Sequence, residues 1–316
     1  MMGADEESLG RDLAARIGEP VREVRAIPTG HSGFTYRVEL EGRRAVLRLP
    51  PPGARIAGPA DIPRQGRIMA ALHAQGLPVP PVLASSAEPV VGGRPFVLMG
   101  ELAGDGIEEA MSAGGDVIRL AGSAVEVLRR LQAVPAASTG IAGESPMSNT
   151  AELGRWAWLM ARAPAELTGS APRLARRLEE TSPAPRPPVM VHGDYHFGNM
   201  LFGAGCVVGV LDWEIAQLGQ PLLDLCCLGV VHEPGHLESE AGTAGGWGVP
   251  HERLLAMFGA DADEIRWPLA LTYYKYAAIF GYNLMLHRRG KRPDATYELR
   301  VDTIVSFIER GIGVLG

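Results

Sequence analysis

Lysine is almost absent from this chain. The sequence holds 30 Lys and Arg residues in total, and only Lys275 and Lys291 are lysines. A cation supplied by the first half of the chain must therefore be an arginine. Its guanidinium is permanently charged and can bind an oxyanion through two parallel hydrogen bonds.

Cysteines and long apolar runs are also scarce. The three cysteines, Cys206, Cys226 and Cys227, have no metal-ligand spacing, and their odd number argues against a disulfide framework. No run of about 18 uncharged apolar residues occurs, so we expect no membrane span and no membrane partner. The N-terminus is acidic and lacks the apolar region of a secretory signal, so we expect a cytoplasmic protein.

Charge is unevenly distributed along the chain. The 316 residues, 46% of them hydrophobic, suffice for about two domains with a sizeable core. The net charge of −6 argues against a nucleic-acid partner. Residues 1–100 carry 12 basic and 10 acidic residues, and the remainder carries 18 basic and 26 acidic residues. The acidic second part suits a cationic substrate, although solvated acidic helices give the same count.

Three oxygen-bearing side chains occur at an informative spacing. Residues 192–199 read His-Gly-Asp-Tyr-His-Phe-Gly-Asn, and Asp212 follows in the sequence Val-Leu-Asp-Trp-Glu. Phosphoryl transfer from a nucleotide uses one carboxylate to orient and deprotonate the attacking hydroxyl, while an amide and a second carboxylate hold magnesium. Asp194, Asn199 and Asp212 supply these groups. For each of them alone, an Asx-turn or a helix cap is the structural alternative.

The surrounding pattern allows the three side chains to meet. Short apolar runs predict three strands, at residues 189–191, 200–202 and 206–211. The loop after the first strand can then lie beside the end of the third. We expect His192 to be a buried, hydrogen-bonded residue without a chemical role. His196 either faces the substrate or is an exposed loop histidine.

The segment H-G-D-x-x-x-x-N resembles the H-R-D-x-x-x-x-N loop of protein kinases, with the Gly that is characteristic of the aminoglycoside phosphotransferase and choline kinase group. The resemblance covers about residues 21–290. It implies an α+β, protein-kinase-like fold with two lobes, and it assigns Asp194 as catalytic base and Asn199 and Asp212 as Mg²⁺ ligands. No A-P-E segment follows Asp212, which argues against a protein kinase.

The first hundred residues carry the expected nucleotide contacts. Strands are predicted at residues 21–27 and 36–40, and the turn between them can present backbone N–H groups to phosphates, or be a plain hairpin. Its candidate residues are Gly30, His31, Ser32 and Gly33. A further strand, 44–49, carries Arg48, which we expect to contact the phosphates unless it is an exposed strand arginine. Its V-L-R-L-P-P-P-G context resembles kinase domains that accompany acyl-CoA dehydrogenases.

One position departs from the family pattern. Asp61 and Pro63 predict the start of a helix that runs to about residue 74. In the resembling kinases this helix carries a Glu that pairs with the strand cation, but here Gln65 occupies the place. We expect at best a neutral hydrogen bond to Arg48. A degraded kinase fold that only binds nucleotide or acts as a scaffold is therefore the alternative.

The resemblance also places the hinge between the lobes. A strand is predicted at residues 95–102, and the backbone of Gly100, Glu101 and Leu102 is expected to meet an adenine or guanine edge. We accordingly expect an N-terminal nucleotide-binding lobe at residues 1–102 and a catalytic and substrate-binding lobe at residues 103–316.

The second lobe is predicted to be mainly helical. Helices are expected at residues 116–133, 149–163, 172–180, 262–286 and 296–312. Asp224 is expected to brace the catalytic loop, and residues 232–248 are expected to form a lid or a disordered loop.

Together these features predict an ATP- or GTP-dependent phosphotransferase, monomeric or homodimeric. Its acceptor would be a small-molecule hydroxyl, on an antibiotic such as an aminoglycoside or macrolide, or on a hydroxyacyl metabolite.

Overall fold

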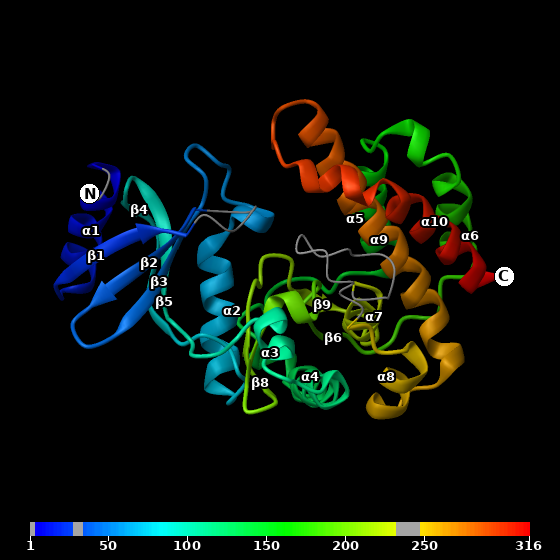
Figure 1. Cartoon of the computed structure of the whole chain (residues 1–316), viewed down its shortest axis with the longest axis horizontal. Coiled ribbons are helices and arrows are strands. Elements are labelled where there is room, and N and C mark those ends of the chain that lie inside the picture. The colour runs from blue at the N-terminus through cyan, green and yellow to red at the C-terminus, as the bar shows by residue number, and fades with distance from the viewer. Residues whose placement is uncertain (1–3, 28–33, 232–246) are drawn as a thin grey trace.

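The computed structural model describes residues 4–27, 34–231 and 247–316. The predicted phosphate-binding turn at Gly30, His31, Ser32 and Gly33 lies outside the described residues, as does most of the 232–248 loop. The remainder forms a small sheet-rich lobe and a larger helical lobe, with the two termini at opposite ends of the molecule (Figure 1). The predicted α+β, kinase-like two-lobed fold is confirmed.

The small lobe is built on a five-stranded antiparallel sheet. Its strands pair in the order β1-β2-β3-β5-β4, and they are β1 Val21–Ala26, β2 Phe34–Leu40, β3 Arg44–Leu49, β4 Val82–Val91 and β5 Arg94–Gly100. Helix α1 (Ala4–Ile17) covers one face, where Leu9 and Leu13 pack against alternate strand residues such as Leu47 and Leu98. This alternation follows from the two-residue period of a strand.

The opposite face of the sheet is covered by helix α2 (Ile62–Ala74). Asp61 caps the helix by accepting a hydrogen bond from the backbone N–H of Arg64 (3.0 Å), as its sequence predicted. A Cβ atom added to Gly66 would lie 2.6 Å from Val97 Cγ2, so the helix approaches β5 closely. Val97 and α2 belong to the same hydrophobic cluster as the large lobe, so this core crosses residue 102. The division of the chain at that residue stays a prediction.

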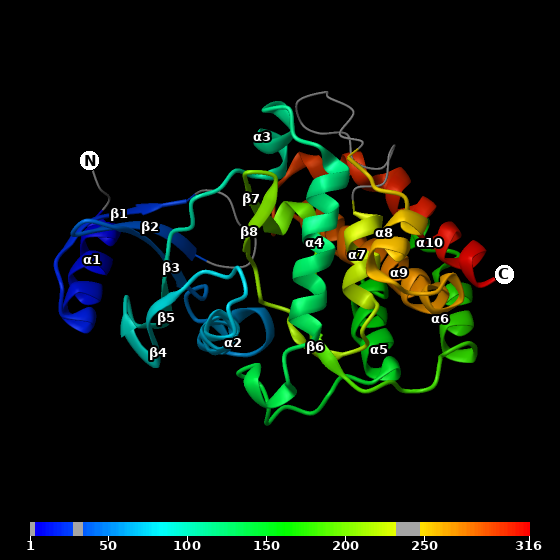
Figure 2. The ribbon, with the colours of Figure 1, turned by 90° about the horizontal axis from the view of Figure 1, so that it is seen from below.

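The large lobe is mainly helical, with two small two-stranded sheets (Figure 2). One sheet pairs β6 (Val189–Val191) with β9 (Gln217–Gly219), and the other pairs β7 (Met200–Gly203) with β8 (Cys206–Val210). The helices are α3 Ile107–Ser112, α4 Val117–Gln132, α5 Asn149–Met160, α6 Ala171–Glu180, α7 Leu223–Val230, α8 His251–Phe258, α9 Ala262–Arg288 and α10 Val301–Leu315. The long helix α9 packs on α5, α6, α7 and α10.

Most predicted elements of the two lobes are present, with three differences. The last helix begins at Val301, since residues 295–300 form a 3₁₀ segment. Helices α3 and α8 and strand β9 were not predicted, because each is short. Strand β4 of the small lobe was not predicted, since its Ser, Ala, Glu and Pro content is unlike that of a typical strand. None of the helices in the described part of the chain is long and apolar enough to cross a membrane.

The close approach of α2 to the sheet can be tested with two glycines in helices. Gly66→Ala should destabilise the protein by about 1–3 kcal/mol, because its methyl group overpacks a fully buried contact with Val97. Gly122→Ala in α4 has no described neighbour within 4 Å and should stabilise by about 0.5–1 kcal/mol. Denaturant unfolding measures both changes. A Gly66→Ala protein as stable as the wild type would show that the helix can move away from the sheet.

Candidate active site

The loop that follows β6 is held by a buried carboxylate. Asp224, in the first turn of α7, accepts hydrogen bonds from the backbone N–H groups of His192 (2.7 Å) and Gly193 (2.9 Å). Burial raises the pKa of Asp224 to about 6, although both N–H groups oppose the shift. Gly193 has a φ of 87°, and a Cβ here would lie 2.8 Å from the carbonyl oxygen of Ile215. The glycine of the motif is therefore required by both conformation and space.

His192 connects this loop to the end of β8. Its side chain is fully buried, and its Nε2 lies 2.8 Å from the carbonyl oxygen of Leu211, while its Nδ1 accepts from the backbone N–H of Asp194 (3.2 Å). Burial lowers the pKa of His192 to about 4, so the ring is neutral near pH 7 and donates through Nε2. The histidine is a structural link, as its sequence context predicted.

Asp194 emerges from the loop into a set of polar partners. Its Oδ1 accepts a hydrogen bond from the Tyr276 hydroxyl (2.8 Å) and lies 3.5 Å from Lys275 Nζ. Its Oδ2 lies 3.3 Å from His196 Nε2 and 3.1 Å from Asn199 Nδ2. Burial alone would raise the pKa of Asp194, but His196, Lys275 and these hydrogen bonds hold it well below its usual range. The carboxylate is therefore ionised and oriented.

Asn199 and Asp212 lie next to one another through the backbone. The Asn199 side chain also donates to the carbonyl oxygen of Asp194 (2.9 Å), and the Asn199 carbonyl accepts from the N–H of Leu211 (2.8 Å). Asp212 follows directly, with a φ of 62°, which is uncommon for a residue other than glycine. The structure therefore brings the three predicted side chains into one region.

Oxygen donors of this kind fit a hard divalent cation. With its amide nitrogen on Asp194, Asn199 keeps its amide oxygen for a ligand, and Asp212 adds a carboxylate. No cluster of three or more His, Cys, Asp or Glu side chains within residues 4–27, 34–231 and 247–316 is arranged to hold a metal. A magnesium ion here would therefore take further ligands from nucleotide phosphates or water.

Arg48 reaches this region from the small lobe. It pairs with Val97 in the sheet and lies on the face that α2 covers. Its Nη1 lies 3.2 Å from Asp212 Oδ1, and its Nη2 lies 3.8 Å from Glu214 Oε2. The predicted phosphate-binding cation is therefore not an exposed strand arginine, and it is placed beside Asp212.

The expected hydrogen bond between Gln65 and Arg48 is not formed. Gln65 is 1% exposed and donates through Nε2 to the carbonyl oxygen of Pro59 (2.9 Å). Its Oε1 has no hydrogen-bond partner among the described residues. The expectation failed because the neighbouring backbone carbonyl satisfies the amide, while Arg48 turns towards acids of the other lobe.

The predicted hinge is bound mainly to the small lobe, and Leu102 reaches the large lobe. The N–H of Gly100 donates to Pro81 (2.9 Å) and that of Glu101 to Arg44 (3.2 Å), and the Glu101 side chain also pairs with Arg37 (2.9 Å). Leu102 packs against Gly209 of β8. Because two N–H groups are already used, a base edge would be met by other groups of this segment.

Two residues of the site were missed in the sequence. Lys275 and Tyr276 lie in the middle of α9, about 80 residues after the loop that they contact. Lys275 is 4% exposed, and its Nζ donates to the carbonyl oxygen of Gly193 and lies 3.4 Å from Cys227 Sγ. Burial alone would lower the pKa of Lys275, but Cys227, Asp194 and other acidic groups around it hold the pKa above its usual value. A lysine in an apolar helix was the available signal, because buried lysines are rare unless paired.

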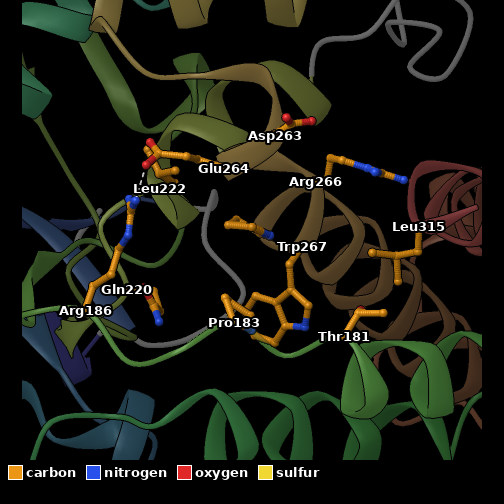
Figure 3. Close-up of a pocket in the computed structure, with 11 residues that line it drawn as sticks. Thr181, Pro183, Arg186, Gln220, Leu222, Asp263, Glu264, Arg266, Trp267 and Leu315 are labelled. Atoms are coloured by element: carbon orange, nitrogen blue, oxygen red, sulfur yellow. Dashed lines mark hydrogen bonds and ion pairs between the residues drawn. The ribbon is translucent and has the colours of Figure 1, made fainter.

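The pocket drawn in Figure 3 is separate from the candidate active site. It has a volume of about 440 Å³ and lies between the connector after α6, the start of α9 and the C-terminus. Trp267 and Pro268 form part of its wall, and an ion pair between Arg186 and Glu264 lies at one side. None of the candidate catalytic or metal-binding residues lines it. The site is therefore defined by converging side chains and not by this pocket.

Comparisons with known proteins identify a family and a fold. A model of the phosphotransferase enzyme family, APH, matches residues 23–260. Acyl-CoA dehydrogenase family member 10 of Mus musculus is 30% identical over 204 residues, which are 62% of this chain and 19% of that protein. The chain thus spans about a fifth of the length of this relative.

Solved structures show the same fold. A Ralstonia eutropha JMP134 protein assigned as an aminoglycoside phosphotransferase superposes with a TM-score of 0.77 at 21% identity, over 96% of this chain and 97% of that one. A thermostable mutant of aminoglycoside phosphotransferase APH(4)-Ia, solved with ADP and hygromycin B, gives 0.64 at 15% identity, over 95% and 98%. Because the family match covers most of the chain, including the loop at residues 192–199 and Asp212, this chain belongs to the phosphotransferase enzyme family.

Proposed function

We propose that this protein transfers the terminal phosphoryl group of ATP or GTP to a hydroxyl group of a small molecule. The observation that carries the proposal is the position of Asp194, an ionised carboxylate held beside Asn199 and Asp212 and opposite Arg48 of the small lobe. The hydroxyl oxygen would form a bond to the terminal phosphorus, the bond to the leaving diphosphate would break, and the proton would pass to Asp194.

The neighbours of Asp194 suit this role. Tyr276 fixes Oδ1 through its hydroxyl, whose pKa is raised well above 10 by burial and by Asp194, so it stays a donor. Lys275 compensates the negative charge from inside the lobe. Oδ2, near His196 and Asn199, is then the oxygen that would accept the proton.

The remaining groups would hold the nucleotide. Asn199 and Asp212 would bind magnesium, which when bound neutralises charge on the phosphates. Arg48 and the backbone of the Gly30 to Gly33 turn would contact the phosphates, and residues 100–102 the base. The nucleotide would lie between lobes 1–102 and 103–316. The complex of the structural relative with ADP supports nucleotide use.

Two comparisons favour different acceptors. The relative named for acyl-CoA dehydrogenases favours a hydroxyacyl metabolite, while the structural relative solved with hygromycin B favours an antibiotic. A degraded kinase fold rests on Gln65 alone. That support is weakened because Arg48 has carboxylate partners elsewhere, at Asp212 and Glu214.

A panel of acceptors tests the reaction. Incubation with Mg²⁺ and ATP or GTP should give nucleoside diphosphate formation that depends on a hydroxylated antibiotic or a hydroxyacyl-CoA. Asp194→Ala should lower kcat by about two to four orders of magnitude, the range for loss of a general base. Full activity of Asp194→Ala would rule out Asp194 as the general base. A panel without any turnover would favour the alternative of a scaffold or nucleotide-binding protein.

The proposed metal ligands predict a second measurement. Asp212→Asn and Asn199→Ala should each raise the Mg²⁺ concentration needed for half-maximal nucleotide binding by at least about tenfold. Asp116→Asn is the matched control, because Asp116 only caps α4. Titration of Mg²⁺ against a fluorescent nucleotide separates the cases, and an unchanged requirement in both variants would remove these residues from the metal site.

Tyr276 predicts a third effect. Tyr276→Phe removes a hydrogen bond to a charged group and should lower kcat by about tenfold or more, with the nucleotide KM unchanged. Tyr274→Phe is the control, because Tyr274 is equally buried on α9 and no hydrogen bond joins its hydroxyl to Asp194 among the described residues. Equal kinetics of the two variants would contradict a role for the hydroxyl in orienting Asp194.

A further inference from the structure

Helix α2 of the small lobe offers Arg48 no acid at position 65. In protein kinases the strand cation pairs with a glutamate of the neighbouring helix. Here the corresponding helix presents Gln65, which is 1% exposed and is bound to Pro59. The helix lies over the same face of the sheet as Arg48, because Gly66 contacts Val97, the cross-strand neighbour of Arg48. A carboxylate at position 65 would thus be near Arg48, but the chain has none there.

Arg48 is nevertheless paired with acids, and these come from the other lobe. Its side chain is 12% exposed and lies against Asp212 and Glu214, whose side chains are 36% and 22% exposed. The two acids are separated by one residue in the Asp-Trp-Glu sequence that follows β8. The acids that lie beside Arg48 therefore belong to this segment and not to α2.

The two acids differ in whether they can stay beside Arg48 when magnesium is bound. A carboxylate at Asp212 that holds magnesium cannot also remain the close partner of Arg48 (3.2 Å). Glu214, at 3.8 Å from Arg48, is then the acid that can keep the guanidinium in place. It carries no magnesium role in the proposed function, and its negative charge is also felt by Arg155.

The same segment receives a second arginine of the small lobe. Arg64, next to Gln65 on α2, donates to the carbonyl oxygen of Ala216 (2.8 Å) and pairs with Glu144 (2.6 Å). Two arginines of the small lobe therefore dock on residues 212–216.

We propose that Glu214 is the positioning residue of Arg48, in place of the acid that α2 lacks. The proposal rests on the proposed function in one respect, that Arg48 binds nucleotide phosphates. It assigns Glu214 to hold the guanidinium in line with the phosphates once Asp212 engages magnesium. It also makes phosphate binding depend on a contact between the lobes, and not on one inside the small lobe.

The sign of the expected effect separates positioning from simple repulsion. If Glu214 only repelled phosphates, Glu214→Gln would tighten nucleotide binding. If it positions Arg48, the same change should weaken Mg·ATP or Mg·GTP binding by about two- to fivefold, the scale of a partly exposed ion pair. Glu144→Gln removes the partner of Arg64 and is the matched control, since it weakens the contact between the lobes without touching Arg48.

The experiment is a double-mutant cycle on the full chain. The nucleotide dissociation constant is measured by calorimetry for wild type, Arg48→Met, Glu214→Gln and the double variant. The expected result is that Glu214→Gln weakens binding in the wild type and has no further effect once Arg48 is gone. Additive losses, tighter binding in Glu214→Gln, or an equal loss in Glu144→Gln would each overturn the proposal.

A second cycle keeps the test independent of the proposed function. If the wild type binds neither nucleotide, the proposed function fails, and the same four proteins are compared by thermal unfolding without ligand. The Arg48–Glu214 pair should then appear as non-additive shifts in Tm, and additive shifts would refute it.

Where the wild type binds nucleotide, a rescue variant adds a further test. Adding Gln65→Glu to Glu214→Gln should restore nucleotide affinity, because it returns the acid to α2. A folded triple of Arg48→Met, Gln65→Glu and Glu214→Gln should show no recovery.

Discussion

The candidate site depends on one buried carboxylate that binds two consecutive backbone N–H groups. Asp224 fixes His192 and Gly193, and this fixes the direction in which Asp194 leaves the loop. The neutral His192 ring then joins the loop to Leu211, the residue before Asp212. Helix α7, the loop and the end of β8 therefore behave as one unit, in which a change to any member moves the carboxylates relative to one another.

Local spacing explains why the sequence identified part of this unit. Asp194 and Asn199 lie in the loop between β6 and β7, and Asp212 follows β8, which pairs with β7, so short-range strand pairing brings this loop close to Asp212. Lys275 and Tyr276 reach the same place only because α9 packs against α7. A stretch of buried aromatic residues in a helix indicates a core face, but it does not reveal which residue of that face meets a carboxylate 80 positions earlier.

The contact between the lobes could be predicted only in part from the sequence. The sequence showed that α2 carries Gln65 in place of an acid. It did not show that Asp212 and Glu214 lie beside Arg48, because these acids belong to the other lobe. Asp212 adopts a left-handed backbone conformation (φ of 62°), which places both it and Glu214 after a sharp change of direction at the end of β8. Such a conformation in a residue other than glycine is most often maintained by surrounding structure at functional positions.

Lys275 explains why a chain with two lysines keeps one of them in its interior. Asp194 and Asp224 lie on either side of the Gly193 segment, and the negative charges of both raise the pKa of Lys275. In return, Lys275 lowers the pKa of each carboxyl group. An isolated buried charge is strongly unfavourable, so each of the three depends on the others. Asp194, the proposed catalytic base, and the structural carboxylate Asp224 therefore share a cation, and this couples the candidate site to the packing that holds it.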